Sequence, residues 1–239
     1  MARAVTAGTL PLVLVPGLLC TERLFAAQRA ALAADGVPVH VADTLHDDSL
    51  DGFAQRLLAH APAHFALAGL SMGGYIAFEV MRTAPERVAK LALLDTSARP
   101  DVPEQTARRH ALIALAQGGA FAEVVAQHYP LFVATARAND PTLRALVETM
   151  AQTVGAAAYV RQQRAIMARP DARPRLAEIA CPTLVVVGED DRLTPPELAA
   201  ELATAIPGAV CRVVAGSGHL APAEAPEEVT AALRAWLAG

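Results

Sequence analysis

The chain has 239 residues, a length that fits one globular domain with room for an insertion. Hydrophobic residues make up 54% of it and charged residues 18%, a composition that excludes a disordered chain. The net charge of −4 provides no basic surface for nucleic acid, and no apolar run reaches the roughly 18 residues of a membrane span. We expect a globular protein that binds neither nucleic acid nor a membrane.

Three cysteines, Cys20, Cys181 and Cys211, form neither an even set nor a closely spaced pair. A disulfide framework needs pairs, and zinc sites usually contain cysteines or histidines close together in the sequence. We therefore predict free, buried thiols in a reducing compartment, which indicates the cytoplasm, and no metal site.

Six short runs are almost continuously apolar, which is typical of strands buried on both faces of a parallel sheet. They are residues 11–15, 37–42, 65–69, 90–95, 183–189 and 209–214. Helical patterns alternate with the strands over the first hundred residues and again near the end. This alternation predicts an α/β fold, with a mostly parallel central sheet flanked by helices.

The predicted helices have recognisable ends. Thr21 opens the first helical pattern, and Gly36 ends it. Thr194 begins a capping box, with Glu197 reaching back toward it. The last helix begins at Pro226, since proline is favoured in the first turn.

The alternation stops between residues 99 and 180, where only helical patterns occur. These patterns cover residues 103–117, 120–128, 140–153 and 156–168. We interpret the segment as a helical cap inserted between two strands of one domain. The core would then consist of residues 1–98 and 181–239.

Residues 69–74, "GLSMGG", lie between a predicted strand and a predicted helix. They match Gly-x-Ser-x-Gly through Gly69, Ser71 and Gly73, the pattern of a sharp turn that exposes a strained serine. The helix N-terminus adds free N–H groups and a partial positive charge. This context favours Ser71 as a nucleophile over a serine that only caps the helix.

A serine hydroxyl needs an adjacent base to act as a nucleophile near neutral pH. Of the seven histidines, six lie within or beside strand or helix patterns. His219 instead lies in the loop "GSGHLAP", between a predicted strand and the last helix. Because an open α/β sheet gathers its active site at the carboxyl ends of its strands, His219 is the predicted base.

The third member of such a set is an acid that orients the histidine. The strand that ends in "VVVGEDDRLTP" offers Glu189, Asp190 and Asp191 in the expected order between serine and histidine. We favour Asp191, with Asp190 as its solvated neighbour. Asp95 remains a rival, because the strand before it also ends on the active-site side.

On these residues the chain resembles the α/β-hydrolase superfamily over nearly its whole length. The resemblance rests on residues 69–74, 188–195 and 218–219, and small-molecule carboxylesterases are most similar, including pimeloyl-carrier-protein methyl esterases and enol-lactonases. The family's Gly-x-x-Asp-x-x-x-Pro pattern implies Asp191 as the acid. The family's cap follows the strand that ends here at Asp95. No metal or organic cofactor is implied.

The stretch "PLVLVPGLLC", Pro11 to Cys20, could be a secretion or lipoprotein signal or the first buried strand. Pro16 and Gly17 interrupt the apolar run, and no small-residue cleavage site follows it. Leu19 is also too large for the position before a lipoprotein cysteine. We predict an enzyme strand, and we expect that Cys20 is not catalytic.

The resemblance also implies the two amides of the oxyanion hole. In the family, the first central strand ends in a His-Gly turn, and the next residue donates one amide. Leu18 takes that position here, and Met72, after the nucleophile, is the second donor. Pro16 replaces the usual histidine, so Leu19 stays open as an alternative to Leu18.

Together these residues predict a serine hydrolase that cleaves small to medium carboxylic esters through an acyl-enzyme. A related enzyme with the same triad is the first alternative: a lactonase, C–C hydrolase, perhydrolase or acyltransferase. A ligand receptor with an inactive triad is the second. Serine at the turn argues against dehalogenase or epoxide-hydrolase chemistry, which similar families perform with aspartate there.

Overall fold

The computed structural model describes residues 9–239. Within them lies one parallel sheet in the order β2-β1-β3-β4-β5-β6. Its strands are β1 (Leu12–Val15), β2 (Val39–Val41), β3 (Phe65–Leu70), β4 (Val88–Leu94), β5 (Thr183–Gly188) and β6 (Val210–Val214). Each apolar run predicted as a strand overlaps one, which confirms the α/β prediction.

The strands differ in burial. All residues of β1, β3 and β5 are buried, and β4 is buried from Leu91 onward. The prediction of burial on both faces is wrong for β2 and β6, where Val213 is 56% exposed. These two strands are the edges of the sheet, and the flanking helices cover them less completely.

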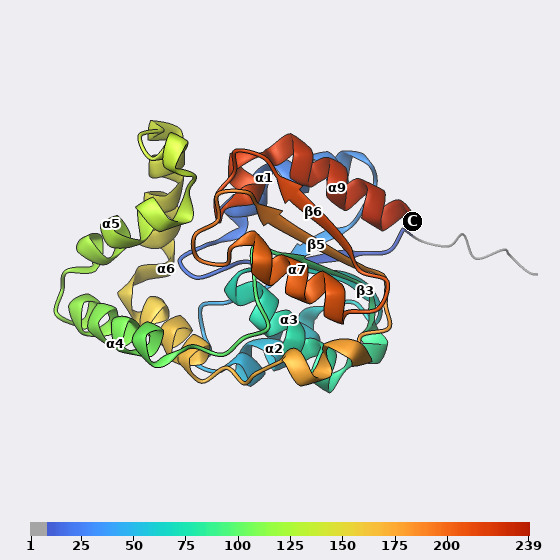
Figure 1. The fold of residues 1–239 in the computed structure, drawn as a ribbon, viewed down its shortest axis with the longest axis horizontal. Helices are drawn as coiled ribbons and strands as arrows, with labels where there is room; N and C mark the ends of the chain where they lie inside the picture. Colours follow the sequence, from blue (N-terminus) through green and yellow to red (C-terminus); the bar gives the residue numbers. More distant parts are fainter. Residues whose placement is uncertain (1–8) are drawn as a thin grey trace, which may run out of the picture.

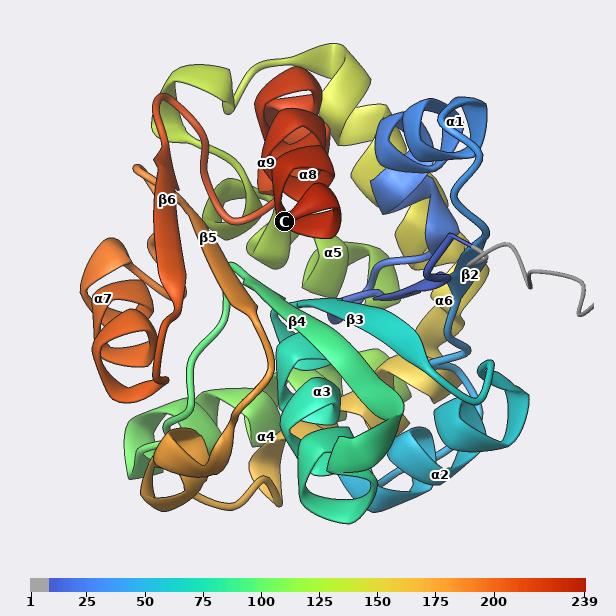
Figure 2. The same cartoon turned by 90° about the vertical axis from the view of Figure 1, so that its right-hand side faces the viewer.

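Helices cover both faces of the sheet. Helices α1 (Ala26–Ala34) and α9 (Pro226–Ala238) lie on one face, and α2 (Leu50–His60), α3 (Met72–Thr83) and α7 (Pro196–Ala205) lie on the other (Figures 1 and 2). Short helices η1 (Glu22–Phe25), η2 (Pro85–Arg87) and α8 (Ala221–Glu224) complete the core. Thr21 caps η1, and Gly36, with φ 79°, follows α1, as predicted. Nowhere in residues 9–239 is a helix both long and apolar enough to cross a bilayer.

Helix α2 was not predicted. The hydroxyl of Ser49 accepts the N–H of Gly52 at its start, and its buried residues are Leu50, Phe53, Ala54 and Leu57. This capping residue and helical spacing were the signals that could have identified it.

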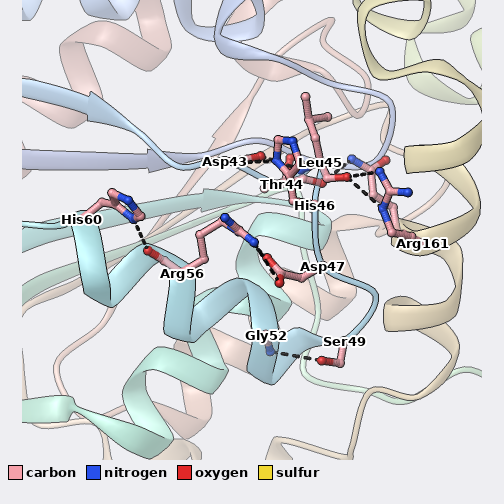
Figure 3. A network of polar contacts seen from close by, with 11 residues as sticks. Asp43, Thr44, Leu45, His46, Asp47, Ser49, Gly52, Arg56, His60 and Arg161 are labelled. Atoms are coloured by element: carbon pink, nitrogen blue, oxygen red, sulfur yellow. Dashed lines mark hydrogen bonds and ion pairs between the residues drawn. The ribbon is translucent and has the colours of Figure 1, made fainter.

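The loop before α2 is held from two sides, as Figure 3 shows. Arg56 of α2 forms an ion pair with Asp47 at 2.5 Å. Arg161, from the distant helix α6 (Pro141–Met167), donates to the carbonyl of Leu45 at 3.0 Å. The loop therefore joins the core to the segment inserted after β4.

The capping box predicted at Thr194 is wrong. Helix α7 begins at Pro196, and its N-cap position is Pro195, which has no side-chain acceptor. The Thr194 hydroxyl instead donates to the carboxylate of Asp191 at 2.6 Å. The helix starts one residue later than predicted, so Thr194 lies before the N-cap position and its hydroxyl donates to the charged acceptor on the preceding turn.

The insertion, residues 99–180, contains only helical elements within its described structure. They are α4 (Pro103–Gln117), α5 (Phe121–Phe132), η3 (Thr135–Arg137), α6 and η4 (Arg173–Glu178). Helices α4, α5 and α6 lie beyond the carboxyl ends of the strands, at the left of Figure 1. Gly155, with φ 70° and ψ 163°, breaks α6 near the gap between the two predicted helices.

Buried polar contacts attach the insertion to the core. Gln162 of α6 donates to the Thr44 carbonyl at 2.9 Å, and its side-chain oxygen accepts the N–H of Leu19 at 3.2 Å. Within the insertion, Asp101 forms ion pairs with Arg169 at 2.6 Å and Arg109 at 2.7 Å, which join its first residues to its last. The insertion therefore has a defined position over the edge of the sheet.

Candidate active site

Three residues other than glycine adopt a left-handed backbone within residues 9–239. Leu19, Ser71 and Asp95 have φ values of 61°, 53° and 44°. They follow β1, β3 and β4 at the same edge of the sheet. Such conformations cost about 1–3 kcal/mol each and are typical of functional sites. The strain therefore points to this edge as the site.

Ser71 is the single residue between β3 and α3. A Cβ on Gly69 would lie 2.2 Å from the Gly73 carbonyl oxygen, and one on Gly73 would lie 2.1 Å from that of Val15. Only glycine therefore fits beside the serine. Thr96 fixes the turn further, because its hydroxyl donates to the Ser71 carbonyl at 2.8 Å.

His219 and Asp191 form a buried pair. Nδ1 of His219 lies 2.8 Å from Oδ2 of Asp191, and each residue is only 2% exposed. Burial alone would raise the pKa of Asp191, but the charge and hydrogen bond of His219 and the bonds from Thr194 outweigh it. The pKa falls to about 2. Asp191 is therefore a carboxylate near neutral pH.

Backbone amides hold Asp191 in place. Its Oδ1 accepts the N–H of Leu193 at 2.8 Å and that of Thr194 at 3.0 Å. Asp190 is exposed, and its hydrogen bond to the His219 loop runs from its own N–H to the Ser217 carbonyl at 2.8 Å. Among the acids considered from the sequence, the structure places only Asp191 against His219.

The rival acid Asp95 contacts a different group. Its Oδ1 accepts the N–H of Gly188 at 2.8 Å, while its Oδ2 has no hydrogen-bond partner in residues 9–239. Burial, followed by the negative charge of Asp191, raises the pKa of Asp95 well above its usual value. Asp95 thus joins the ends of β4 and β5 and does not orient the histidine.

Glu224, which the sequence did not identify, holds the loop around His219. Its carboxylate accepts the N–H groups of Gly218 at 3.0 Å and Leu220 at 3.3 Å, the two neighbours of His219. It also accepts the N–H of Ala134 in the insertion at 2.8 Å. Burial raises the pKa of Glu224, and these amides and Arg137 act in the opposite direction. Its five-residue spacing from His219 was the available signal, but it did not identify amides as partners.

The candidate oxyanion amides differ in availability. The N–H of Leu19 donates to Gln162, as described above, so it is already engaged. The N–H groups of Leu18 and Met72 donate to no other group in residues 9–239. Both belong to the turns that flank Ser71, which favours Leu18 over Leu19 as the first donor.

A pocket of about 300 Å³ lies between this edge of the sheet and the insertion. Ser71, His219 and Leu18 line it together. Phe132 of α5 stacks on the His219 ring, with the ring centroids 6.0 Å apart. Ser71 makes no side-chain hydrogen bond to His219 within the described residues, and such contacts often tighten only when substrate binds.

Cys20 also lines the pocket, and it is buried. Burial raises the pKa of its thiol to about 12, against the lowering effect of a backbone hydrogen bond to Gly17. The thiol therefore stays protonated and is a poor nucleophile. Across residues 9–239, no three histidine, cysteine, aspartate or glutamate side chains gather as metal ligands.

Known proteins are similar to this chain over most of its length. The profile described as "Alpha/beta hydrolase family" matches residues 12–232. The chain is 33% identical over 166 residues to "Putative carbamate hydrolase RutD" of Azorhizobium caulinodans, a match that covers 67% of this chain and 61% of that protein. It is 30% identical over 165 residues to the pimeloyl-[acyl-carrier protein] methyl ester esterase of Chromobacterium violaceum, covering 67% and 65%. Each match thus spans less than two thirds of the relative's length.

Solved structures extend the likeness to nearly the whole chain. A thermophilic esterase from Thermogutta terrifontis, solved with malate bound, has a TM-score of 0.87 and 30% identity. The similarity covers 95% of this chain and 89% of that one. This chain therefore shares the fold of that esterase over nearly its whole length.

Proposed function

Because this chain belongs to the alpha/beta hydrolase family, we propose that it is a serine hydrolase that cleaves carboxylic esters of small to medium size. The observation that carries the proposal is the buried pair of His219 and Asp191, 2.8 Å apart, whose histidine lines one pocket with the strained Ser71. The names of its relatives, which include an esterase of methyl esters and a carbamate hydrolase, support attack at an acyl carbon.

The first half of the proposed reaction forms an acyl-enzyme. The Oγ of Ser71 attacks the ester carbonyl carbon while Nε2 of His219 takes the hydroxyl proton. The carbonyl oxygen becomes an oxyanion and accepts hydrogen bonds from the amides of Leu18 and Met72. When this intermediate collapses, the bond to the alcohol oxygen breaks and His219 returns the proton to the leaving alcohol.

The second half releases the acid. A water molecule attacks the acyl carbon, and His219 takes its proton. The second tetrahedral intermediate then expels the Oγ of Ser71, which receives the proton back from His219. Asp191, ionised throughout, accepts the Nδ1–H of His219 and so keeps Nε2 free to act as the base.

The insertion is proposed to act as a cap over the acyl and alcohol groups. Its residues Phe132 and Leu131 line the pocket beside His219. A pocket of about 300 Å³ suits a small to medium substrate better than a long acyl chain. Lactonases, C–C hydrolases, perhydrolases and acyltransferases use the same triad, and product analysis in the presence of alcohol or peroxide distinguishes them.

The test is hydrolysis of p-nitrophenyl esters from acetate to laurate, with a phenyl carbamate alongside. We expect turnover that is highest for short acyl chains and that is lost in the Ser71→Ala variant. The Cys20→Ala variant is the control and should retain activity. Folded wild-type protein that hydrolyses none of these compounds would overturn the proposal, as would a Ser71→Ala variant as active as the wild type.

A further inference from the structure

The pocket around Ser71 is lined by positive charge. Four arginines line it, and no aspartate or glutamate does; the arginines are Arg99, Arg108, Arg109 and Arg169. Any anionic group on a substrate would therefore meet only cations and neutral side chains on the pocket wall. This imbalance bears on the choice of substrate.

Carboxylates that do not line the pocket neutralise only part of the positive charge of these arginines. Glu201 pairs with Arg99 at 2.9 Å. Asp101 is the only carboxylate among residues 9–239 that forms an ion pair with Arg109 or with Arg169. The side chain of Arg108 forms no ion pair or hydrogen bond with any residue from 9 to 239. Arg108 is thus the cation that is free to bind an anion in the pocket.

A neutral polar side chain lies near Arg108. His128 of α5 lines the same pocket and is only 6% exposed, yet its Nδ1 has no hydrogen-bond partner within residues 9–239. Burial, and then the charges of Arg108 and Arg109, lower its pKa to about 3. The imidazole is therefore uncharged near neutral pH, and both arginines lie close enough to affect it.

Ring contacts place this group relative to the reacting atoms. The His128 ring packs edge-on against Phe132 at 5.4 Å, and Phe132 stacks on His219 at 6.0 Å. His128 is thus separated from the base by one aromatic ring. A substrate group that reaches His128 must extend several bonds beyond the ester carbonyl.

We propose that Arg108, with His128 beside it, binds a carboxylate carried by the substrate, so that the preferred substrates are esters with a second, anionic end. This inference rests on the proposed esterase function and names its substrate class. An arginine fork suits a planar carboxylate, because two parallel N–H bonds can form. The apolar lining around Phe132 and Leu131 would contact the methylene chain between the two ends.

The size of the effect follows from the exposure of Arg108. The residue lines the pocket and is exposed, so water and salt screen its charge. An ion pair of this kind increases kcat/KM roughly fivefold at low ionic strength. The preference should shrink as salt is added, whereas the hydrolysis of neutral esters should depend on salt much less.

The experiment compares matched pairs of esters. Mono-p-nitrophenyl esters of glutaric and adipic acid are measured against p-nitrophenyl esters of monocarboxylic acids with the same number of carbons. Acetoxybenzoate measured against phenyl acetate tests a carboxylate on the alcohol side. We expect the wild type to prefer the charged member of at least one set roughly fivefold, and Arg108→Gln to abolish that ratio.

The control variant is Arg164→Gln, an exposed arginine of α6 that does not line the pocket. It should keep the wild-type ratio. If the wild type hydrolyses the neutral esters and shows no preference for the charged ester of any pair, this inference is overturned and the esterase proposal still stands. An equal loss of the ratio in both variants would also overturn it. Hydrolysis of neither kind of ester would instead contradict the esterase proposal itself.

Discussion

Asp95 and Asp191 lie at the same edge of the sheet, but their carboxyl groups contact different partners. Both carboxyl groups are buried, but Asp191 faces a histidine, whereas Asp95 faces one backbone amide and has an oxygen without a partner. Their pKa values move in opposite directions for that reason, downward for Asp191 and upward for Asp95. One group is ionised to orient a base, and the other favours its protonated form.

The raised pKa of Asp95 predicts a pH dependence of stability. Because folding favours the protonated carboxyl, its contribution is fully present below the ordinary aspartate pKa of about 3.9 and is lost as pH rises through the folded-state value. Asp95→Asn has no such proton to lose, and asparagine tolerates the left-handed backbone. We expect the stability of the variant relative to the wild type to increase with pH, measured by urea unfolding.

Asp190→Asn is the control for this prediction, since its side chain is exposed to water in the next loop. It should show no comparable increase. A stability difference for Asp95→Asn that stays constant from pH 4 to pH 9, or that decreases, would contradict the assignment of Asp95 as a buried acid that resists ionisation.

At this scale the sequence identified residues through local patterns. Three local patterns were informative: the glycines around Ser71, the glycine-containing loop at His219 and the acids after β5. The structure places Ser71 and His219 in one pocket and pairs His219 with Asp191. Glu224 could not be found in this way. Its partners are backbone amides of residues 218, 220 and 134, and amides carry no signature in the sequence.

At the scale of elements, the loop between β6 and α9 fixes the position of the base. Glu224, on α8, accepts the N–H groups on both sides of His219 and one from the insertion. Both of its carboxylate oxygens are used. The glutamate is therefore a positioning residue that acts through the loop and not through the substrate.

Glu224→Gln should lower kcat roughly tenfold and change KM less. The substitution replaces one acceptor oxygen by an NH₂ group that faces a backbone N–H, and hydrogen bonds to a charged group contribute about 1.5–3 kcal/mol. Steady-state kinetics on a short-chain ester measure the effect. Glu227→Gln, three residues on and exposed, is the matched control. Equal kcat values for the two variants would show that Glu224 does not position the base.

Elements were predicted well where a single pattern determined them. The four central strands follow continuous apolar runs, and the break at Gly155 follows a gap between two helical patterns. The edge strands were misjudged, because the sequence does not tell which apolar strand the helices leave uncovered. At Thr194 a matching motif formed no capping box, since the helix begins one residue later and the Thr194 hydroxyl donates to the carboxylate of Asp191.

At the scale of the whole molecule, the main feature is the insertion that covers the carboxyl edge of the sheet. Asp101 lies at this junction, with its side chain only 2% exposed and both Arg109 and Arg169 bound to it. Arg169 also donates to the Arg99 carbonyl at 2.9 Å and lies over the ring of Tyr75. One buried carboxylate thus holds the start of the insertion to its end.

Asp101→Asn should destabilise the protein by roughly 3 kcal/mol, because it leaves a buried guanidinium without a counter-charge. Thermal unfolding measures the loss, and limited proteolysis should cut within residues 99–180 first. Asp171→Asn removes an exposed ion pair with Arg173 and should cost at most about 1 kcal/mol. Equal melting temperatures for the two variants would contradict this account of how the insertion is held.

The central claim is that Ser71 is a nucleophile activated by His219 and Asp191. The most direct measurement is reaction with a fluorophosphonate, followed by intact-protein mass and mapping of the modified peptide. The wild type should gain one adduct at Ser71, Ser71→Ala none, and Asp191→Asn should react more slowly, by a factor of up to roughly 10⁴. An adduct on another residue, or none on the folded wild type, would contradict the claim.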